Sequence, residues 1–318
     1  MPTGKPKFGL HIHLDKDINR SYQFIEAFQP PSVTIIDDIP LFRWCVEHKY
    51  VRWPVFRQVW GPWDPQPFHV GDESDIARGY KFFFEGHTQD MNLWWWNKQC
   101  PPGSILQIQN ETNSWKMAWW IIGACQAARH AGYRLAYGNI SVGQFANAEV
   151  NGQLVRPLYF DEQGNPRGDI VPGTNQTIWE HFLPCIKYSA AIQDPDQCDI
   201  FGVHVYGNEE DGQHRWPDDF GAPYYRDRIV NFMKMTPKPW PFIIYTEYGS
   251  GKTERQKDTG FEATWTGIKN FTKFIKPYPN ILCGNVWTQG DQWGHLGFGG
   301  ASLDYAIPEM IKRKAELQ

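Results

Sequence analysis

The stretch Ser104–Asn113, SILQIQNETN, decides how the rest of the chain is interpreted. It follows Cys-Pro-Pro-Gly, a strong loop signal, and its apolar and polar residues alternate as in a β-strand. Successive side chains of a strand point to opposite faces, so Gln107, Gln109 and Glu111 share one face. Three polar side chains on one face are unusual for a buried strand. The pattern is explained if that face points into a polar cavity with Glu111 at its mouth.

A second stretch has the same shape. Pro241–Gly249, PFIIYTEYG, is an apolar strand signal that Glu247 ends. A catalytic carboxylate at a strand end needs a second carboxylate across the same cavity. We therefore expect the remainder of the chain to form the frame that holds Glu111 and Glu247 apart.

Strand and helix signals alternate along the whole chain. The strand signals lie at 8–14, 31–37, 50–57, 104–111, 133–141, 199–206, 242–247 and 281–288. The helix signals lie at 18–28, 41–49, 72–99, 114–131, 177–192, 225–235, 259–274 and 307–317. Eight strand–helix units in one chain of 318 residues predict a single α/β domain over residues 1–318, a (β/α)8 TIM barrel. An open doubly wound sheet is the alternative, but the first strand is not followed by a glycine-rich phosphate loop.

The loop that follows the fifth strand signal is long. Residues 142–175 contain the turn signals Asn151-Gly152 and Gln163-Gly164-Asn165 between strand-like pieces. This pattern predicts a small β-hairpin lid inserted over the C-terminal face of the barrel, where the active sites of such barrels lie.

The composition bears on which classes of binding partner the protein could have. A net charge of −4 does not indicate a basic surface for nucleic acid, and no apolar stretch is long enough to span a membrane. Aromatic residues make up 16% of the chain, with 16 Trp, and their flat faces suit sugar rings as well as cores. The N-terminus has no signal-peptide pattern, which favours a cytoplasmic or phage-associated enzyme and leaves a secreted mature form open. Six scattered cysteines indicate free buried thiols.

The placement of Asn110-Glu111 and Glu247 carries a family resemblance. An Asn-Glu pair at the end of strand four and a Glu at the end of strand seven resemble the retaining glycoside hydrolases of clan GH-A, which are (β/α)8 barrels. The resemblance implies cleavage of β-linked oligo- or polysaccharides without a cofactor or a catalytic metal. It makes Glu111 the acid/base and Glu247 the nucleophile, held about 5–5.5 Å apart.

Further residues would bind the sugar or orient the nucleophile. Asn110 would bond the sugar 2-OH, and Tyr206 or His204 would hydrogen-bond Glu247. The remaining candidates are Trp287 as the floor of the pocket, His11 or His13 with Asp37 or Asp38 as hydroxyl-binding groups, and Trp60 as a platform at the mouth.

Two other functions fit part of the sequence. His11 and His13 form an HxH pair on the first strand, which resembles the metal pair of amidohydrolase-type barrels, but the fifth strand lacks the histidine that such a site needs. The chain could also be a non-catalytic carbohydrate-binding barrel. The presence of both glutamates favours the glycosidase.

Overall fold

The structure is a computed structural model, and it describes residues 6–13, 18–57, 71–85, 93–109, 115–140, 148–206, 223–249, 261–288 and 303–317. Eight parallel strands form a closed barrel, which confirms the predicted fold class and all eight predicted strands. In chain order they are β1 (Phe8–His13), β2 (Ser32–Ile36), β3 (Trp53–Arg57), β4 (Ile105–Gln107), β5 (Arg134–Ile140), β10 (Ile200–Tyr206), β11 (Ile243–Gly249) and β12 (Ile281–Thr288). The barrel closes where β12 pairs with β1.

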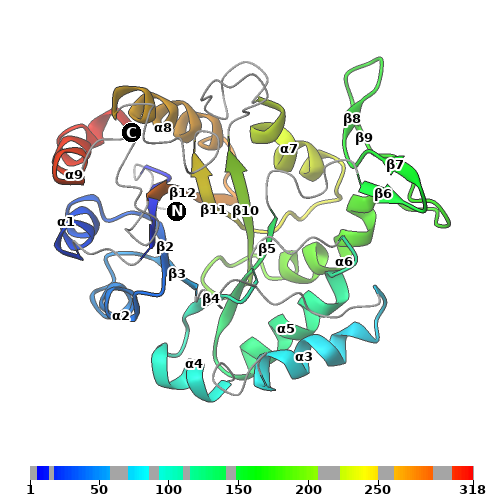
Figure 1. The fold of residues 1–318 in the computed structure, drawn as a ribbon, viewed down its shortest axis with the longest axis horizontal. Helices are drawn as coiled ribbons and strands as arrows, with labels where there is room; N and C mark the ends of the chain where they lie inside the picture. The colour runs from blue at the N-terminus through cyan, green and yellow to red at the C-terminus, as the bar shows by residue number, and fades with distance from the viewer. Residues whose placement is uncertain are drawn as a thin grey trace.

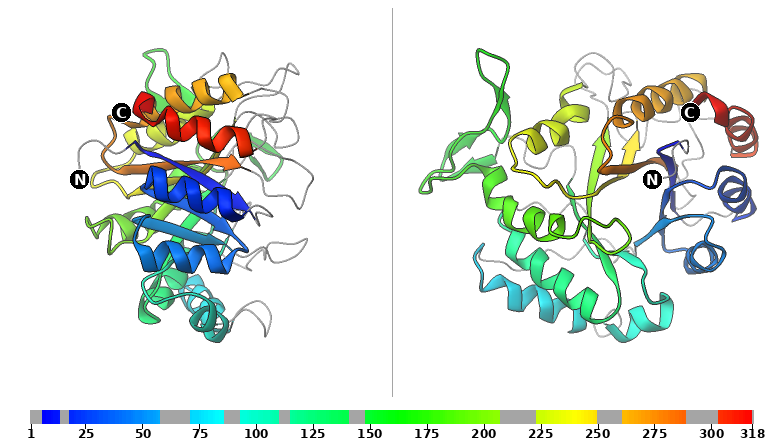
Figure 2. Two further views of the ribbon diagram at one scale, coloured as in Figure 1. Left: turned by 90° about the vertical axis from the view of Figure 1, so that its left-hand side faces the viewer. Right: turned by 180° about the vertical axis from the view of Figure 1, so that it is seen from behind.

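Helices surround the barrel, as Figures 1 and 2 show. They are α1 (Ile18–Phe28), α2 (Ile39–His48), α3 (Asp75–Glu85), α4 (Leu93–Gln99), α5 (Ala118–His130), α6 (Ile178–Ala190), α7 (Pro223–Lys234), α8 (Phe261–Ile275), α9 (Leu303–Lys312) and the 3-10 turn η3 (Lys314–Leu317). The helix signal predicted over 72–99 holds two helices, α3 and α4. The last helix, α9, packs against the first, α1. Among the described residues, no helix is long and apolar enough to cross a membrane.

The barrel interior changes character along its axis. An apolar layer fills the first half of the strands, and it consists of Trp53, Val55, Ile105, Ala136, Cys198, Ile200, Ile244 and Leu282. A separate and larger apolar cluster packs between the barrel and the helices. Buried polar side chains follow the inner layer toward the strand ends, among them Arg57, Gln107, His204 and Glu247. The apolar layer therefore closes one end of the barrel and leaves the carboxyl ends of the strands to polar groups.

The insertion after β5 folds as two short antiparallel hairpins. They pair β6 (Ala148–Val150) with β7 (Gln153–Val155), and β8 (Tyr159–Phe160) with β9 (Pro166–Arg167). Figures 1 and 2 place them at the outer edge of the molecule beside α6. The predicted hairpin structure is thus present, and its function as a lid remains a prediction.

Candidate active site

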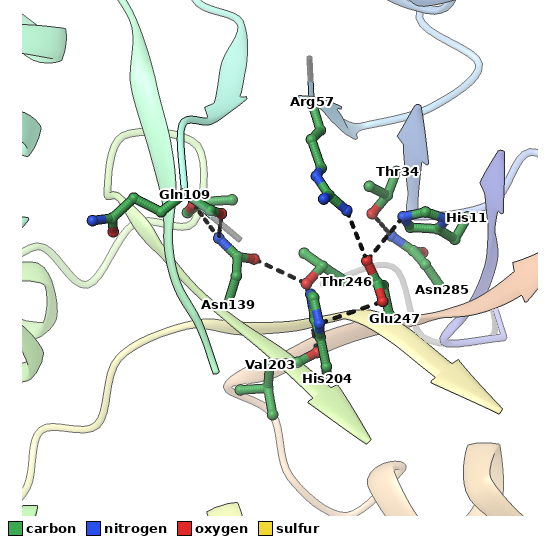
Figure 3. A network of polar contacts seen from close by, with 11 residues as sticks. His11, Thr34, Arg57, Gln109, Asn139, Val203, His204, Thr246, Glu247 and Asn285 are labelled. Atoms are coloured by element: carbon green, nitrogen blue, oxygen red, sulfur yellow. Dashed lines mark hydrogen bonds and ion pairs between the residues drawn. The ribbon is translucent and has the colours of Figure 1, made fainter. Parts of the chain in front are cut away.

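Glu247 lies on β11 and is almost fully buried. The register with β10 pairs Val203 with Tyr245 and then His204 with Glu247, so Thr246 is an extra residue on β11. Such a β-bulge bends a strand and re-aims the side chains that follow it. Because of the bulge, Tyr245 and Tyr248 both face outward and pack on the ring of Phe271 in α8. The carboxylate of Glu247 points into the barrel instead (Figure 3).

Three basic side chains from three strands meet at this carboxylate. Arg57 Nη1, from the end of β3, donates to Glu247 Oε1 at 3.1 Å. His11 Nε2, from β1, lies 3.3 Å from the same oxygen. His204 Nδ1, from β10, lies 3.3 Å from Oε2. Both carboxylate oxygens therefore face a basic nitrogen, an arrangement that favours the charged form and fixes its orientation.

The protonation states at the site follow from burial and charge. Burial by itself raises the pKa of Glu247, but His204, His11 and Arg57 outweigh it and hold this pKa well below its usual range. Burial lowers the pKa of His11 to about 4, although the nearby Glu247 charge acts in the opposite direction. Near neutral pH, Glu247 is then ionised and His11 is a neutral imidazole that can donate from Nε2. An ionised, oriented carboxylate is suited to nucleophilic attack and cannot supply a proton.

A second polar group supports the strands behind the site. Asn285 of β12 donates from Nδ2 to Ser32 Oγ at 3.1 Å and to Thr34 Oγ1 at 2.9 Å, both on β2. All three side chains are buried, and a buried amide is tolerated because it is hydrogen-bonded. The network ties β12 to β2 across β1, the strand that carries His11.

The structure brings together two of the predicted site residues, Glu247 and His204. Of the predicted histidine pair, His11 contacts Glu247. His13, Tyr206 and Trp287 lie in β1, β10 and β12, with side chains outside the described part of the structure. Glu111, Asn110 and Trp60 also lie outside the described residues, so their positions remain predictions.

Of the acidic pair after β2, Asp38 caps a helix and Asp37 remains a candidate for the expected role. Asp38 was a candidate for binding sugar hydroxyls, but its carboxylate accepts from the backbone N–H of Leu41 at 3.0 Å and caps α2. Asp37 has a left-handed backbone (φ 58°), and its N–H donates to the carbonyl of Arg57 at 3.0 Å. Asp37 is partly exposed and stays a candidate for substrate binding.

Sequence reasoning missed Arg57 and misplaced Gln109. Arg57 ends the alternating stretch 50–57, and a basic residue at the end of an apolar strand was the signal that could have identified it. Gln109 was expected on the cavity face with Gln107, but Figure 3 shows its side chain extending away from Glu247. β4 ends at Gln107, so strict alternation does not continue through Gln109.

Comparison with known proteins adds support at the level of the fold. No family model matches the chain, and no curated protein matches it. Among solved structures, a BuGH86 variant in complex with neoagarooctaose has a TM-score of 0.50 at 12% identity, over 92% of this chain and 54% of that chain. A β-glucuronidase of an uncultured Clostridium sp. has a TM-score of 0.46 at 11% identity, over 97% of this chain and 50% of that chain. A family 5 xyloglucanase from Paenibacillus pabuli has a TM-score of 0.46 at 11% identity, over 98% and 97%.

The chain spans about half the length of the first two of these proteins. At this identity the likeness to the BuGH86 variant supports the barrel architecture and does not by itself assign an activity to this chain.

Proposed function

We propose that the protein is a retaining glycoside hydrolase that cleaves β-linked oligo- or polysaccharides by double displacement. The observation that carries the proposal is the buried carboxylate of Glu247, held ionised by Arg57, His11 and His204 at the carboxyl end of a barrel strand. The BuGH86 variant, whose barrel has a similar fold, was solved in complex with the oligosaccharide neoagarooctaose, which agrees with this choice.

Each step assigns one task to each glutamate. Glu247 attacks the anomeric carbon while Glu111 gives its proton to the departing glycosidic oxygen, which breaks the C–O bond and leaves a glycosyl ester on Glu247. Glu111, now a carboxylate, takes a proton from water, and the hydroxide attacks the anomeric carbon and releases Glu247. Two inversions give net retention. Asn110 and Trp287 are proposed to bind the sugar, with Tyr206, His13, Asp37 and Trp60 as further binding residues.

The three basic side chains around Glu247 explain why this carboxylate suits its role. They lower its proton affinity, so it is charged before substrate arrives, and they fix the direction of its lone pairs. Arg57 also bears on the amidohydrolase alternative. The Arg57 guanidinium lies 3.1 Å from Oε1 and occupies the position where a metal cation would bind that oxygen. Its positive charge would also repel such a cation. This observation favours the glycosidase over the metal-dependent reading of His11.

Mutation of the two glutamates tests the proposal. We expect Glu247→Ala to lose turnover of aryl β-glycosides, and added azide to restore it with an inverted product, because azide can fill the vacated space. Glu111→Ala should retain the first step on dinitrophenyl glycosides, whose leaving group needs little protonation, and should lose activity on natural glycans. Azide should then give a retained product.

The exposed Glu47→Ala in α2 is the matched control and should behave as the wild type. Wild-type activity in both Glu247→Ala and Glu111→Ala would show that the active site lies elsewhere. No hydrolysis by the wild type across β-glucosides, β-galactosides, β-xylosides and β-glucans would favour the non-catalytic carbohydrate-binding barrel.

A further inference from the structure

A second β-bulge lies on the other side of β10 from the one at Thr246. β10 pairs with β5 as Gly202 with Gly138 and then as Val203 with Ile140, so Asn139 is an extra residue on β5. Gly138 and Asn139 both have positive φ, 84° and 41°. Such a conformation is uncommon outside glycine, although asparagine tolerates it better than most residues. The strand is therefore kinked at the point where Asn139 turns inward.

The side chains of the two bulged residues bond each other across β10. Thr246 Oγ1 donates to Asn139 Oδ1 at 3.0 Å. Asn139 Nδ2 donates to the carbonyl of Gln109 at 3.1 Å and to that of Ala136 at 2.8 Å. Asn139 is completely buried, so each of these bonds is made away from solvent. Figure 3 shows the resulting line of contacts from Gln109 through Asn139 to Thr246, the neighbour of Glu247.

Gly202 of β10 leaves the space that the contact needs. A Cβ atom built at Gly202 would lie 2.0 Å from Asn139 Oδ1 and 2.8 Å from its Cγ. Any side chain at this position would displace the amide that Thr246 contacts. The three adjacent strands β5, β10 and β11 therefore share one arrangement. It consists of the two bulges, the hydrogen bond between Thr246 and Asn139, and Gly202, which leaves room for that bond.

We propose that Asn139 is a positioning residue for the nucleophile. Asn139 bonds the carbonyl of Gln109, two residues before Glu111, and the hydroxyl of Thr246, the residue before Glu247. It therefore sets the spacing of the two strand ends that carry the glutamates. This inference rests on the proposed function, because the spacing matters only if the two glutamates act on one bond. Removal of the link lets the Thr246 bulge relax and turns the Glu247 carboxylate out of line with the anomeric carbon.

The rate at which Glu247 is trapped measures this alignment directly. 2,4-Dinitrophenyl 2-deoxy-2-fluoro-β-glycosides of glucose, galactose and xylose form the glycosyl ester without needing a proton from Glu111. The ester is located by peptide mass mapping, and saturation kinetics separate binding of the probe from the trapping step. A displaced nucleophile lowers the trapping rate constant and leaves the probe's apparent dissociation constant unchanged.

Two variants break the link in different ways. Thr246→Val removes the hydroxyl and keeps the side-chain shape, and Asn139→Gly removes the amide and permits the positive φ. We expect both to trap Glu247 at least about tenfold more slowly, since a misplacement of about 1 Å can cost far more than that. Thr246→Ser retains the hydroxyl and should recover most of the rate. Thr272→Val in α8, a buried threonine outside this network, is the matched control and should trap at the wild-type rate.

Folded Thr246→Val and Asn139→Gly proteins that trap Glu247 at the wild-type rate would overturn the positioning role while the proposed function stands. If Asn139→Gly does not fold, Thr246→Val alone decides the question. If none of the three probes labels the wild type and it hydrolyses no β-glycoside, the proposed function fails and the positioning role falls with it.

Discussion

His11 is a buried imidazole beside a carboxylate, and its proton affinity links the site to the stability of the fold. Its pKa is about 4 in the folded chain against an ordinary value of 6.5, so the unfolded chain binds the proton first as the pH falls. The part of the folding stability that depends on a neutral His11 is fully present above about pH 6.5 and is lost as the pH falls toward 4. The full loss is about 3 kcal/mol, at about 1.4 kcal/mol per pH unit.

Urea unfolding from pH 7 to pH 4.5 measures this loss. His11→Gln still offers a donor to Glu247 but does not titrate, so its stability should change less with pH than that of the wild type. His48→Gln, at an exposed position in α2, is the control. Equal pH slopes in the wild type and in His11→Gln would contradict a neutral, buried His11. Below about pH 4.5 the lowered pKa of Glu247 adds a further loss, because its carboxylate is protonated first in the unfolded chain.

Gly202 makes a second prediction at the scale of a residue. Gly202→Ala places a methyl group against the Asn139 amide, at 2.0 Å from Oδ1 before any adjustment. We expect a fall in turnover of at least about tenfold, with a smaller change in KM, because the nucleophile moves while other sugar contacts remain. Lys187→Ala, at an exposed position in α6, is the control for activity. Unchanged turnover in a folded Gly202→Ala would contradict the tight contact.

At the scale of elements, α3 and α5 approach each other through two glycines. A Cβ atom at Gly79 would lie 1.9 Å from the carbonyl oxygen of Trp120, and one at Gly123 would lie 1.9 Å from that of Ile76. The backbones of α3 and α5 are therefore in direct contact. A side chain added at either glycine would force one helix to shift as a whole. Gly79→Ala and Gly123→Ala should each lower the free energy of unfolding by about 1–3 kcal/mol, measured in urea.

The sign of this effect distinguishes packing from helix propensity. Alanine is the better helix former, so an uncrowded glycine would gain up to about 1 kcal/mol on the same substitution. Lys81→Ala, exposed on α3, controls for a general effect of mutation on that helix. A stabilised Gly79→Ala would contradict the close approach of the two helices.

Elements were easier to predict from the sequence than the two bulges were. Short apolar and β-branched runs, some alternating and some continuous, located all eight strands, because each strand buries one face in the outer core. Period-two reasoning assumes an unbroken strand, and one inserted residue leaves no mark in such a pattern. Thr246 and Asn139 were therefore invisible as bulges, although Asn139 beside Gly138 was a local hint of a left-handed backbone.

At the scale of the whole molecule, the order of strands was predictable and the content of the site was predictable only in part. Glu247 and His204 stand on neighbouring strands, so counting strands was enough to bring them together. Arg57 and His11 reach Glu247 from β3 and β1, which are not neighbours of β11 in the sheet. Their meeting depends on how far each side chain reaches across the interior, which is a property of the closed barrel and not of any one strand.

The six buried cysteines make local opening of the barrel and its helices measurable by chemical labelling. All six are free and buried, and burial raises the pKa of Cys45, Cys100, Cys198 and Cys283 to about 12 and that of the other two well above its usual range. A thiol reacts as its thiolate, so an alkylating reagent can modify each one only after its surroundings separate. The cysteines are spread from α2 to β12. The order in which a pulse of iodoacetamide modifies them therefore reports which regions of the barrel and its helices open first.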